Sequence, residues 1–270
     1  MTGKSGRLVV CPTPIGNLSD VTLRLLVMLR EADVIACEDT RVTRKLLARH
    51  EIKPRALVSY HEHNERRCAR QLLGRVERGE LVALVSDAGT PGVSDPGRIV
   101  VDACLDAGLP VEVLPGPSSV VTALVASGLP DESWTFVGFL PRKQGELRDL
   151  LAGMSRTTVA FESPKRVENA LAALAEIDPQ RPVAVCRELT KLHEEVVRGS
   201  AAELAQRFAE GTRGEVVLVI GASEADRATG DLSAARDAVD RLVEAGARRR
   251  PAAAVVSSLT GLPANKLYGS

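Results

Sequence analysis

A pair of closely spaced histidines is the feature of this chain best suited to proton transfer. His61 and His63 are separated by one residue in the segment HEHNE, residues 61–65. Histidine titrates near neutral pH, so either ring could act as a base. On an extended strand the two rings would point to the same side. The spacing also suits metal ligands, but no third ligand pattern accompanies the pair, and we expect no metal site.

Three loops rich in glycine and proline offer a place to bind a small molecule. Each follows a short apolar run: 7–11 precedes PTPIGN, 81–85 precedes SDAGTPGVSDPG, and 111–114 precedes PGPSS. Glycine lets the backbone approach a ligand or adopt a positive φ, and proline stiffens the path. In an open α/β sheet, ligands bind beyond the carboxyl ends of the strands. We therefore expect the three loops to converge on one edge of a parallel sheet.

Two common nucleotide-binding motifs are absent from the sequence. A dinucleotide fingerprint needs G-x-G-x-x-G after the first strand, but only Gly16 follows Cys11 there. The segment Gly3-Lys4-Ser5 lacks the preceding glycine and strand of a phosphate-binding P-loop. The loops therefore indicate a ligand other than a dinucleotide or a nucleoside triphosphate.

Composition sets the broad class of the protein. The chain has 270 residues, 44% of them hydrophobic and only 3% aromatic, so we expect two or three units with aliphatic cores. Five scattered cysteines include no C-x-x-C pair, and we expect neither a disulfide framework nor a zinc site. There is no run of about eighteen apolar residues and no signal sequence, which predicts a soluble, cytoplasmic protein. A net charge of zero argues against a surface that binds nucleic acid all over.

The alternation of apolar runs and helical patterns predicts the domains. Strands and helices alternate over 7–127, which predicts an N-terminal αβ domain with a mostly parallel, Rossmann-like sheet. Hairpin-like neighbours over 131–223 predict a second αβ domain with a mixed sheet. Segments 128–132 and 223–230 read as linkers, and 231–270 as a small helical extension.

Six motifs in chain order resemble one known family. They are CPTPIGNLSD at 11–20, CEDTR at 37–41, HEHNE, SDAGTPGVSDPG at 86–97, LPGPSS at 114–119, and RELTK at 187–191. Together they are similar to the RsmI-type 16S ribosomal RNA 2′-O-methyltransferases, a branch of the tetrapyrrole-methylase superfamily. The resemblance covers nearly the whole chain. It implies transfer of a methyl group from S-adenosylmethionine to the ribose of a cytidine in the decoding region, near the ribosomal P site (cytidine 1402 in the family).

The same resemblance implies a cofactor cleft between the two αβ domains. In this chain Thr90 stands where the superfamily often has an acid, so the resemblance gives no support to an ion pair at that position. Ser118 and Ser119 can offer hydroxyl groups and helix N-terminal amides to the methionine carboxylate. Glu162 either lines the adenine site or forms an ion pair with Lys165 or Arg166. The residues carried over as cofactor-binding are Thr13, Pro14, Gly16, Ser86, Asp87, Gly89, Thr90, Pro91, Val93, Ser118, Ser119, Phe161, Glu162 and Leu189.

Methyl transfer to a ribose hydroxyl needs alignment of the nucleophile and removal of a proton. His61 or His63 could accept that proton, or both could only make hydrogen bonds within the motif or to RNA phosphate. Lys191 could stabilise the 2′-oxyanion or bind a phosphate. Arg187 and Glu188 are further candidates, with a structural ion pair as the alternative.

RNA contact is expected to be local and to use clusters of basic residues. Such clusters are often only solvated faces, and the C-terminal tail could equally pack on its own or a partner domain. The family resemblance also implies a homodimer and the 30S ribosomal subunit as partner. Two other functions stay open: a tetrapyrrole or precorrin C-methyltransferase with the same cofactor, and a non-catalytic RNA-binding module. The basic clusters are 41–49, 66–70, 142–143 and 248–250.

Overall fold

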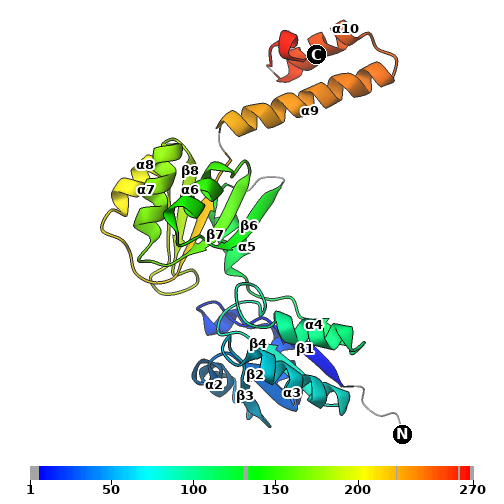
Figure 1. The fold of residues 1–270 in the computed structure, drawn as a ribbon, viewed down its shortest axis with the longest axis vertical. Helices are drawn as coiled ribbons and strands as arrows, with labels where there is room; N and C mark the ends of the chain where they lie inside the picture. Colours follow the sequence, from blue (N-terminus) through cyan, green and yellow to red (C-terminus); the bar gives the residue numbers. More distant parts are fainter. Residues whose placement is uncertain (1–5, 130–132, 223, 261, 268–270) are drawn as a thin grey trace.

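The computed structural model describes residues 6–129, 133–222, 224–260 and 262–267. Figure 1 shows an elongated molecule in which two sheet-containing domains follow one another along the long axis, with a pair of helices beyond the second. Each domain is built on a five-stranded sheet. The two αβ domains with a helical extension confirm the predicted fold class.

The first sheet is entirely parallel, as the alternating pattern predicts. Its strands are β1 (Arg7–Cys11), β2 (Val34–Cys37), β3 (Leu57–Ser59), β4 (Leu81–Val85) and β5 (Val111–Val113), in the order β3-β2-β4-β1-β5. Helices α1 (Leu23–Glu31) and α2 (Thr40–Arg49) pack on one face, and α3 (Glu65–Glu77) and α4 (Arg98–Asp106) on the other. Because all strands run the same way, the loops that follow β1, β2, β3, β4 and β5 meet at one edge.

One helix start differs from the sequence prediction. Ser19 or Asp20 would cap α1 on sequence grounds, but these residues form the short 3-10 helix η1 (Leu18–Asp20). The N-cap of α1 is Thr22, whose side chain accepts a hydrogen bond from the backbone N–H of Leu25. Threonine satisfies the first turn of the helix as well as serine or aspartate would.

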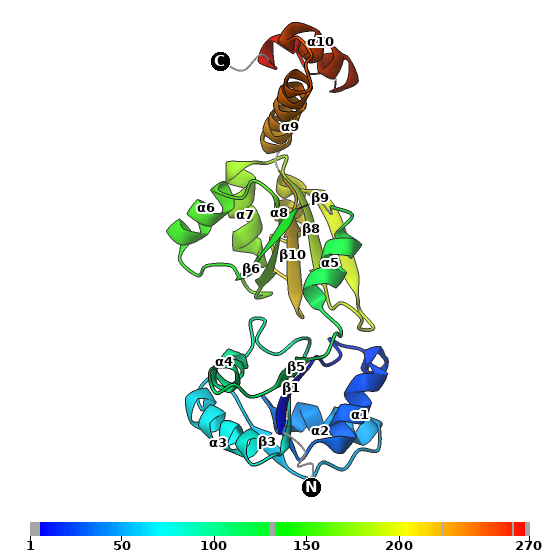
Figure 2. The same cartoon turned by 90° about the vertical axis from the view of Figure 1, so that its right-hand side faces the viewer.

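The second sheet is mixed, as predicted. Its strands are β6 (Trp134–Phe139), β7 (Thr157–Glu162), β8 (Pro182–Arg187), β9 (Glu195–Ser200) and β10 (Val216–Ile220), in the order β6-β7-β10-β8-β9. Only the β6–β7 pair is parallel. Helices α6 (Gln144–Ala152), α7 (Val167–Ile177) and α8 (Ala201–Arg207) pack on one face, and α5 (Ser119–Ser127) covers the other (Figure 2).

Helix α5 joins the two domains. It follows the last strand of the first sheet, and the sequence pattern therefore groups it with the first domain. In the structure Val120, Ala123 and Leu124 belong to the same apolar cluster as Val159 and Val219 of the second sheet. The packing thus places α5 with the second sheet. The domain limits 7–127 and 131–223 stay predictions. Residues 130–132 of the predicted hinge lie outside the described residues.

The C-terminal extension has its own small core. Helices α9 (Glu224–Glu244) and α10 (Arg249–Thr260) and the 3-10 helix η2 (Ala264–Lys266) enclose Val239, Ala253 and Leu267. The predicted linker at 223–230 is helical from residue 224 onward, because α9 begins there; residue 223 is not described. Glu, Ala and Arg are strong helix formers and outweigh the polarity of this segment. In the described part of the chain, no helix is long and apolar enough to cross a membrane.

Candidate functional site

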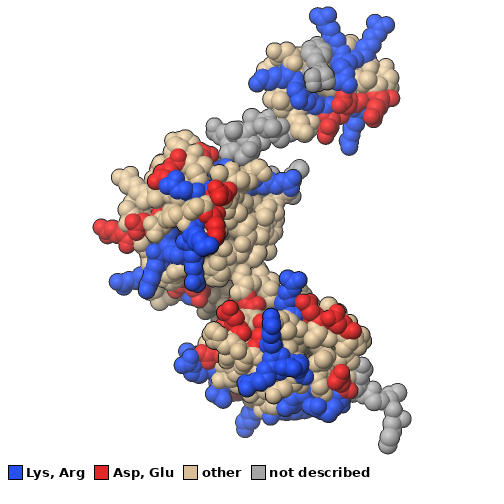
Figure 3. All heavy atoms as spheres, viewed as in Figure 1, with Lys and Arg blue, Asp and Glu red and all other residues tan. Residues whose placement is uncertain are grey.

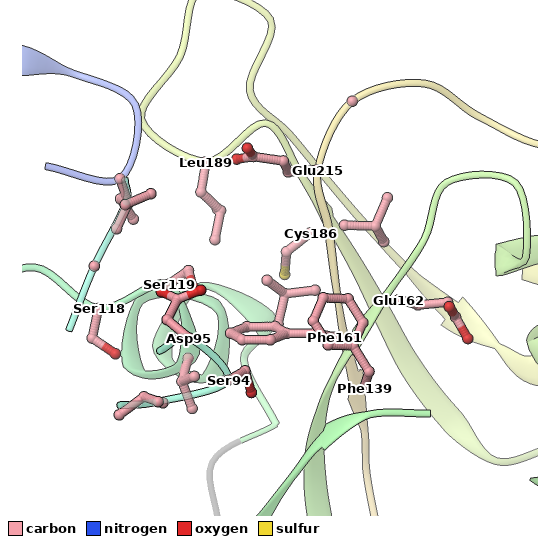
Figure 4. A pocket seen from close by; sticks show the side chains of 18 of the residues that line it. Ser94, Asp95, Ser118, Ser119, Phe139, Phe161, Glu162, Cys186, Leu189 and Glu215 are labelled. Carbon is pink, nitrogen blue, oxygen red and sulfur yellow. The ribbon is translucent and has the colours of Figure 1, made fainter. Parts of the chain in front are cut away.

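A cavity of about 380 Å³ lies between the two αβ domains (Figure 4). The first domain contributes the glycine-rich loop after β4 and part of the PTPIGN loop, and the N-terminus of α5 lies beside them. The second domain contributes the ends of β6, β7, β8 and β10. The lining residues are Ile15, 88–90, 93–95, 118–120, Phe139, 161–164, Cys186, Leu189 and 214–217.

The loops after β1 and β4 are joined into one unit. The backbone N–H of Thr13 donates to the carbonyl of Gly89 at 2.9 Å, and the N–H of Gly89 donates back to Thr13 at 3.1 Å. The Thr13 hydroxyl donates to the Ser86 carbonyl, and the Ser86 hydroxyl donates to the Gly89 carbonyl. Gly89 has φ +79°, a conformation that disfavours any side chain. The network fixes the wall of the cavity before any ligand binds.

The N-terminus of α5 supplies polar groups to the cavity. Ser118 is the N-cap residue, yet its side chain forms no capping hydrogen bond to the helix. Ser118 and Ser119 both line the cavity. The first amides of a helix lack intrahelical partners and favour a negative charge nearby. This end of the cavity is therefore suited to a carboxylate.

The second domain contributes an apolar wall. The rings of Phe139 and Phe161 meet edge to face, with centroids 5.5 Å apart. Leu189 and Cys186 are both buried and line the cavity with them (Figure 4). Burial raises the pKa of Cys186 to about 11, so its thiol is neutral and behaves as an apolar group. Such a wall is suited to a flat aromatic group.

The charged residues among the described lining residues of the cavity are all acidic. Asp95, Glu162 and Glu215 line it, and no Lys, Arg or His is among the described lining residues. Glu162 forms an ion pair with Arg166 at 2.5 Å and accepts a hydrogen bond from the Ser163 N–H at 2.6 Å, so this residue both lines the cavity and forms the ion pair. A wall of this charge disfavours phosphates and suits a cation.

Asp95 stands out among these carboxylates. It lies in the glycine-rich loop directly after Ser94, which has φ +61°. Burial, followed by the nearby charges of Glu38 and Asp87, raises the pKa of Asp95 to about 7. Asp95 was not among the residues predicted from the sequence, although an acid inside a ligand-binding loop was the signal that could have identified it. Phe139 and Glu215 were also missed, and no sequence motif marked them.

The predicted cofactor residues separate into three groups. Eight line the main cavity: Gly89, Thr90, Val93, Ser118, Ser119, Phe161, Glu162 and Leu189. Four line a smaller hollow of about 40 Å³: Thr13, Pro14, Ser86 and Asp87. Gly16 and Pro91 line neither.

Gly16 has a different environment from the other loop residues. A Cβ on Gly16 would lie 2.6 Å from Cγ of Lys191 and 2.9 Å from the carbonyl of Leu189. The close approach joins the PTPIGN loop of the first domain to the RELTK segment of the second. Glycine is required there because the two domains meet backbone against side chain.

The two histidines lie in the turn after β3 and not on an extended strand, where their rings would have pointed to the same side. Their ring centroids are 5.9 Å apart, and neither His61 nor His63 is among the lining residues of the cavity. Nδ1 of His61 is buried and has no hydrogen-bond partner in the described part of the chain. Asn64 organises the turn, since its side chain accepts from the His61 N–H and donates to the Ser59 carbonyl.

Glu65 connects the HEHNE motif to the glycine-rich loop. Its Oε1 accepts hydrogen bonds from the Tyr60 hydroxyl and from the Gly97 N–H, each at 2.9 Å. Gly97 ends the loop that carries Asp95, and its φ is +154°. In this structure the motif thus holds the loop in place.

The RELTK segment forms a network of ion pairs beside the cavity. Nζ of Lys191 lies 2.9 Å from both Glu188 Oε1 and Glu215 Oε2. Burial lowers the pKa of Lys191, but the two carboxylates outweigh that effect and raise it. The pKa of Glu188 is lowered by hydrogen bonds from the Glu215 N–H and from Lys191. Arg187 pairs with Glu195 at 2.9 Å, and none of the three predicted residues Arg187, Glu188 and Lys191 is among the described lining residues.

Comparison with known proteins agrees with this architecture. A family model described as Tetrapyrrole (Corrin/Porphyrin) Methylases matches residues 7–205. The ribosomal RNA small subunit methyltransferase I of Micromonospora olivasterospora is 45% identical over 269 residues, covering 98% of this chain and 86% of the relative. The protein of the same name from Mycobacterium tuberculosis (strain ATCC 25618 / H37Rv) is 46% identical over 270 residues, covering 98% and 94%.

Among solved structures, the uroporphyrin-III C-methyltransferase of Thermus thermophilus aligns with a TM-score of 0.55 and 25% identity, covering 80% of this chain and 94% of that chain. A further structure under the same protein name is described as complexed with S-adenyl homocysteine. The match over most of the chain, together with the cavity between two αβ domains, assigns the family. The chain belongs to the tetrapyrrole methylases and, within them, to the ribosomal RNA small subunit methyltransferase I family.

Proposed function

We propose that this protein transfers a methyl group from S-adenosylmethionine to the ribose 2′-hydroxyl of a cytidine in the decoding region of 16S ribosomal RNA, cytidine 1402 in the family. The observation that carries the proposal is the acidic, partly apolar cavity between the domains, in a chain 45% identical to a ribosomal RNA small subunit methyltransferase I. The name of that relative supports the RNA substrate. The 2′-hydroxyl and the particular cytidine rest on the resemblance of the six motifs.

The cavity fits S-adenosylmethionine, the cofactor of this protein, in three respects. The rings of Phe139 and Phe161 provide an apolar wall for an adenine ring. The helix N-terminus at Ser118 and Ser119 suits the methionine carboxylate. The acidic wall around Asp95 suits a sulfonium cation and would repel the phosphates of other nucleotide cofactors.

The residues of this chain would act mainly by alignment. When bound, S-adenosylmethionine supplies an electrophilic methyl group on sulfur. The joined loops around Gly89 hold the first-domain wall rigid, so little reorganisation is needed when substrate enters. The contact between Gly16 and Lys191 and the ion pairs of Lys191 hold the second domain against the first. Together these contacts would keep the two walls of the cavity in a fixed relative position around the bound cofactor.

Exposed basic residues support an RNA substrate. The basic side chains of the four clusters predicted from the sequence are all exposed. The first of these clusters lies on α2, where Arg41 forms an ion pair with Asp39 at 2.6 Å. Figure 3 shows Lys and Arg gathered on the visible face of the first domain and on the C-terminal extension. Such patches bind phosphates, whereas the target nucleotide would have to leave its stack to enter the cavity.

The direct test is methyl transfer from tritiated S-adenosylmethionine to 30S subunits that lack the modification, followed by mapping of the labelled nucleotide. Labelling of a cytidine ribose supports the proposal. Labelling of a precorrin or of uroporphyrinogen, with no label in 30S subunits, would instead assign the tetrapyrrole reaction. Binding of the cofactor with neither product would assign neither reaction.

We further propose that the protein is a homodimer, as the resemblance implies, and that it is cytoplasmic, as its sequence composition predicts. Sedimentation equilibrium of the full chain measures its mass directly. A mass of twice 28.7 kDa supports the dimer, and the monomer mass contradicts it.

A further inference from the structure

Asp95 is the cavity carboxylate that has no partner. Glu162 is held by Arg166 and by the Ser163 N–H, and Glu215 is held by Lys191. In the described part of the chain, no hydrogen-bond donor or cation contacts the carboxylate of Asp95, which lines the cavity (Figure 4). A proton acceptor needs a lone pair that the fold has not already used. Of the three carboxylates, Asp95 alone meets that condition.

The backbone of the loop that carries Asp95 is also held in a fixed conformation. The loop that carries it contains Gly92 at φ +84° and Ser94 at φ +61°, a path that few sequences adopt. The Gly97 N–H at the end of this loop donates to Glu65, which also binds the Tyr60 hydroxyl. A strained loop that is held by a partly buried hydrogen-bond network keeps its side chain in one position. Such rigidity is what a group that must meet a substrate atom requires.

We propose that the Asp95 carboxylate is the base that accepts the proton of the attacking ribose hydroxyl. The assignment rests on the proposed function and names the proton acceptor within it. The ribose oxygen forms a bond to the methyl carbon as the carbon–sulfur bond breaks, and the bonding pair stays on sulfur as the sulfonium becomes a neutral thioether. The hydroxyl proton passes to Asp95 and then to water. The positive charge that sulfur loses is therefore balanced by the release of this proton.

The charges around Asp95 suit this role. The acidic groups that act on it are Glu38 from the loop after β2 and Asp87 from the loop after β4. His61 acts in turn on Glu38, and Asp39 and Arg41 act on Asp87. The net effect disfavours the ionised form, which makes the carboxylate a stronger base than an exposed aspartate. Its ionised form carries the activity, so turnover should rise with pH and level off above about 8.

The test compares Asp95→Asn with the matched control Asp102→Asn, an exposed aspartate on α4 that pairs with Arg98 outside the cavity. Single-turnover methylation of 30S subunits is measured from pH 5.5 to 9, and cofactor affinity by calorimetry. We expect Asp95→Asn to lower the rate at least about 100-fold at pH 8 and to lose the inflection near pH 7, and we expect saturating cofactor not to restore the rate. Asp95→Glu should retain an inflection and part of the rate, and the control should match wild type.

Four results would overturn the assignment. If Asp95→Asn keeps the wild-type rate, another group takes the proton. If the variant loses cofactor affinity but regains the full rate at saturating cofactor, Asp95 is a binding residue. If Asp95→Asn does not fold, the wild-type profile decides, and the absence of an inflection between pH 6 and 8 rejects the assignment. If the wild type itself does not label 30S subunits, the proposed function fails, and the role of Asp95 fails with it.

Discussion

Gly89 offers a substitution that separates ligand binding from folding. Its φ is +79°, and an added Cβ would meet Ile15 Cγ2 at 3.6 Å and the Pro117 carbonyl at 4.0 Å, which are ordinary contacts. The cost of Gly89→Val therefore comes mainly from the backbone, about 1–2 kcal/mol for a side chain in the left-handed region. Total stabilities of about 5–15 kcal/mol absorb such a loss, so the variant should fold. Its two γ-carbons extend from the cavity wall, where they would exclude the ligand.

The matched control is Gly108→Val. Gly108 has φ +68° in the turn after α4, nothing lies within 4 Å of its added Cβ, and it is not among the described lining residues of the cavity. Both variants should therefore lower the thermal midpoint by a similar amount. Calorimetric titration with S-adenosylmethionine should show at least a tenfold weaker affinity for Gly89→Val alone, equivalent to about 1.4 kcal/mol. Unchanged affinity in a folded Gly89→Val protein would refute the placement of the cofactor in this cavity.

Three further predictions follow from the contacts described above. Because the pKa of Asp95 is raised in the folded protein, its contribution to stability is complete below pH 3.8 and is lost as pH rises through about 7. Asp95→Asn should abolish this pH-dependent loss of stability, which is on the order of 1–2 kcal/mol after screening. Thermal midpoints of both proteins at pH 5 and pH 8 measure it. An identical pH dependence in both proteins would contradict it. Gly16→Ala should lower the thermal midpoint by several degrees because its Cβ would meet Lys191 Cγ at 2.6 Å, whereas Gly74→Ala, with space available in α3, should not lower it. His61→Asn and His63→Asn should reduce turnover less than tenfold, since neither ring lines the cavity; a loss of 100-fold or more would return the proton acceptor to the HEHNE motif.

The sequence predicts the first half of the cavity well because the relevant signals are local. Strand periodicity and the positions of glycine and proline fix where β1, β4 and β5 end, and parallel strands bring those ends to one edge. These signals place the loops of Gly89, Thr90 and Ser118 at that edge, whereas the cofactor-binding role of the three residues came from the family resemblance. Helix α5 shows the limit of that reasoning. Its position in the chain predicts that it belongs to the first domain. In the structure its apolar face is buried against the second sheet, and this burial of apolar surface determines where the helix packs.

The second-domain wall could not be predicted because it is assembled from residues distant in sequence. Phe139, Cys186 and Val217 lie on three different strands and share no motif. Their meeting depends on the order β6-β7-β10-β8-β9, in which the last strand of the sequence lies in the middle of the sheet. Apolar residues at strand ends are common to most sheets, so the sequence pattern alone does not distinguish a ligand wall from an ordinary core.

Charged residues show why chemistry is harder to assign than architecture. HEHNE and RELTK contain the residue types that catalysis needs, yet in the structure Glu65 binds Gly97, Lys191 binds Glu188 and Glu215, and Arg187 binds Glu195. Each of these side chains already forms a hydrogen bond or ion pair within the protein, so it is not free to form the corresponding bond with a substrate. Asp95 carries no such partner in the described part of the chain, and it faces repulsive neighbours in a half-buried loop. Which acid stays unpaired depends on contacts between residues far apart in the chain, so the reactive group becomes visible only when the fold has shown which charges are already paired.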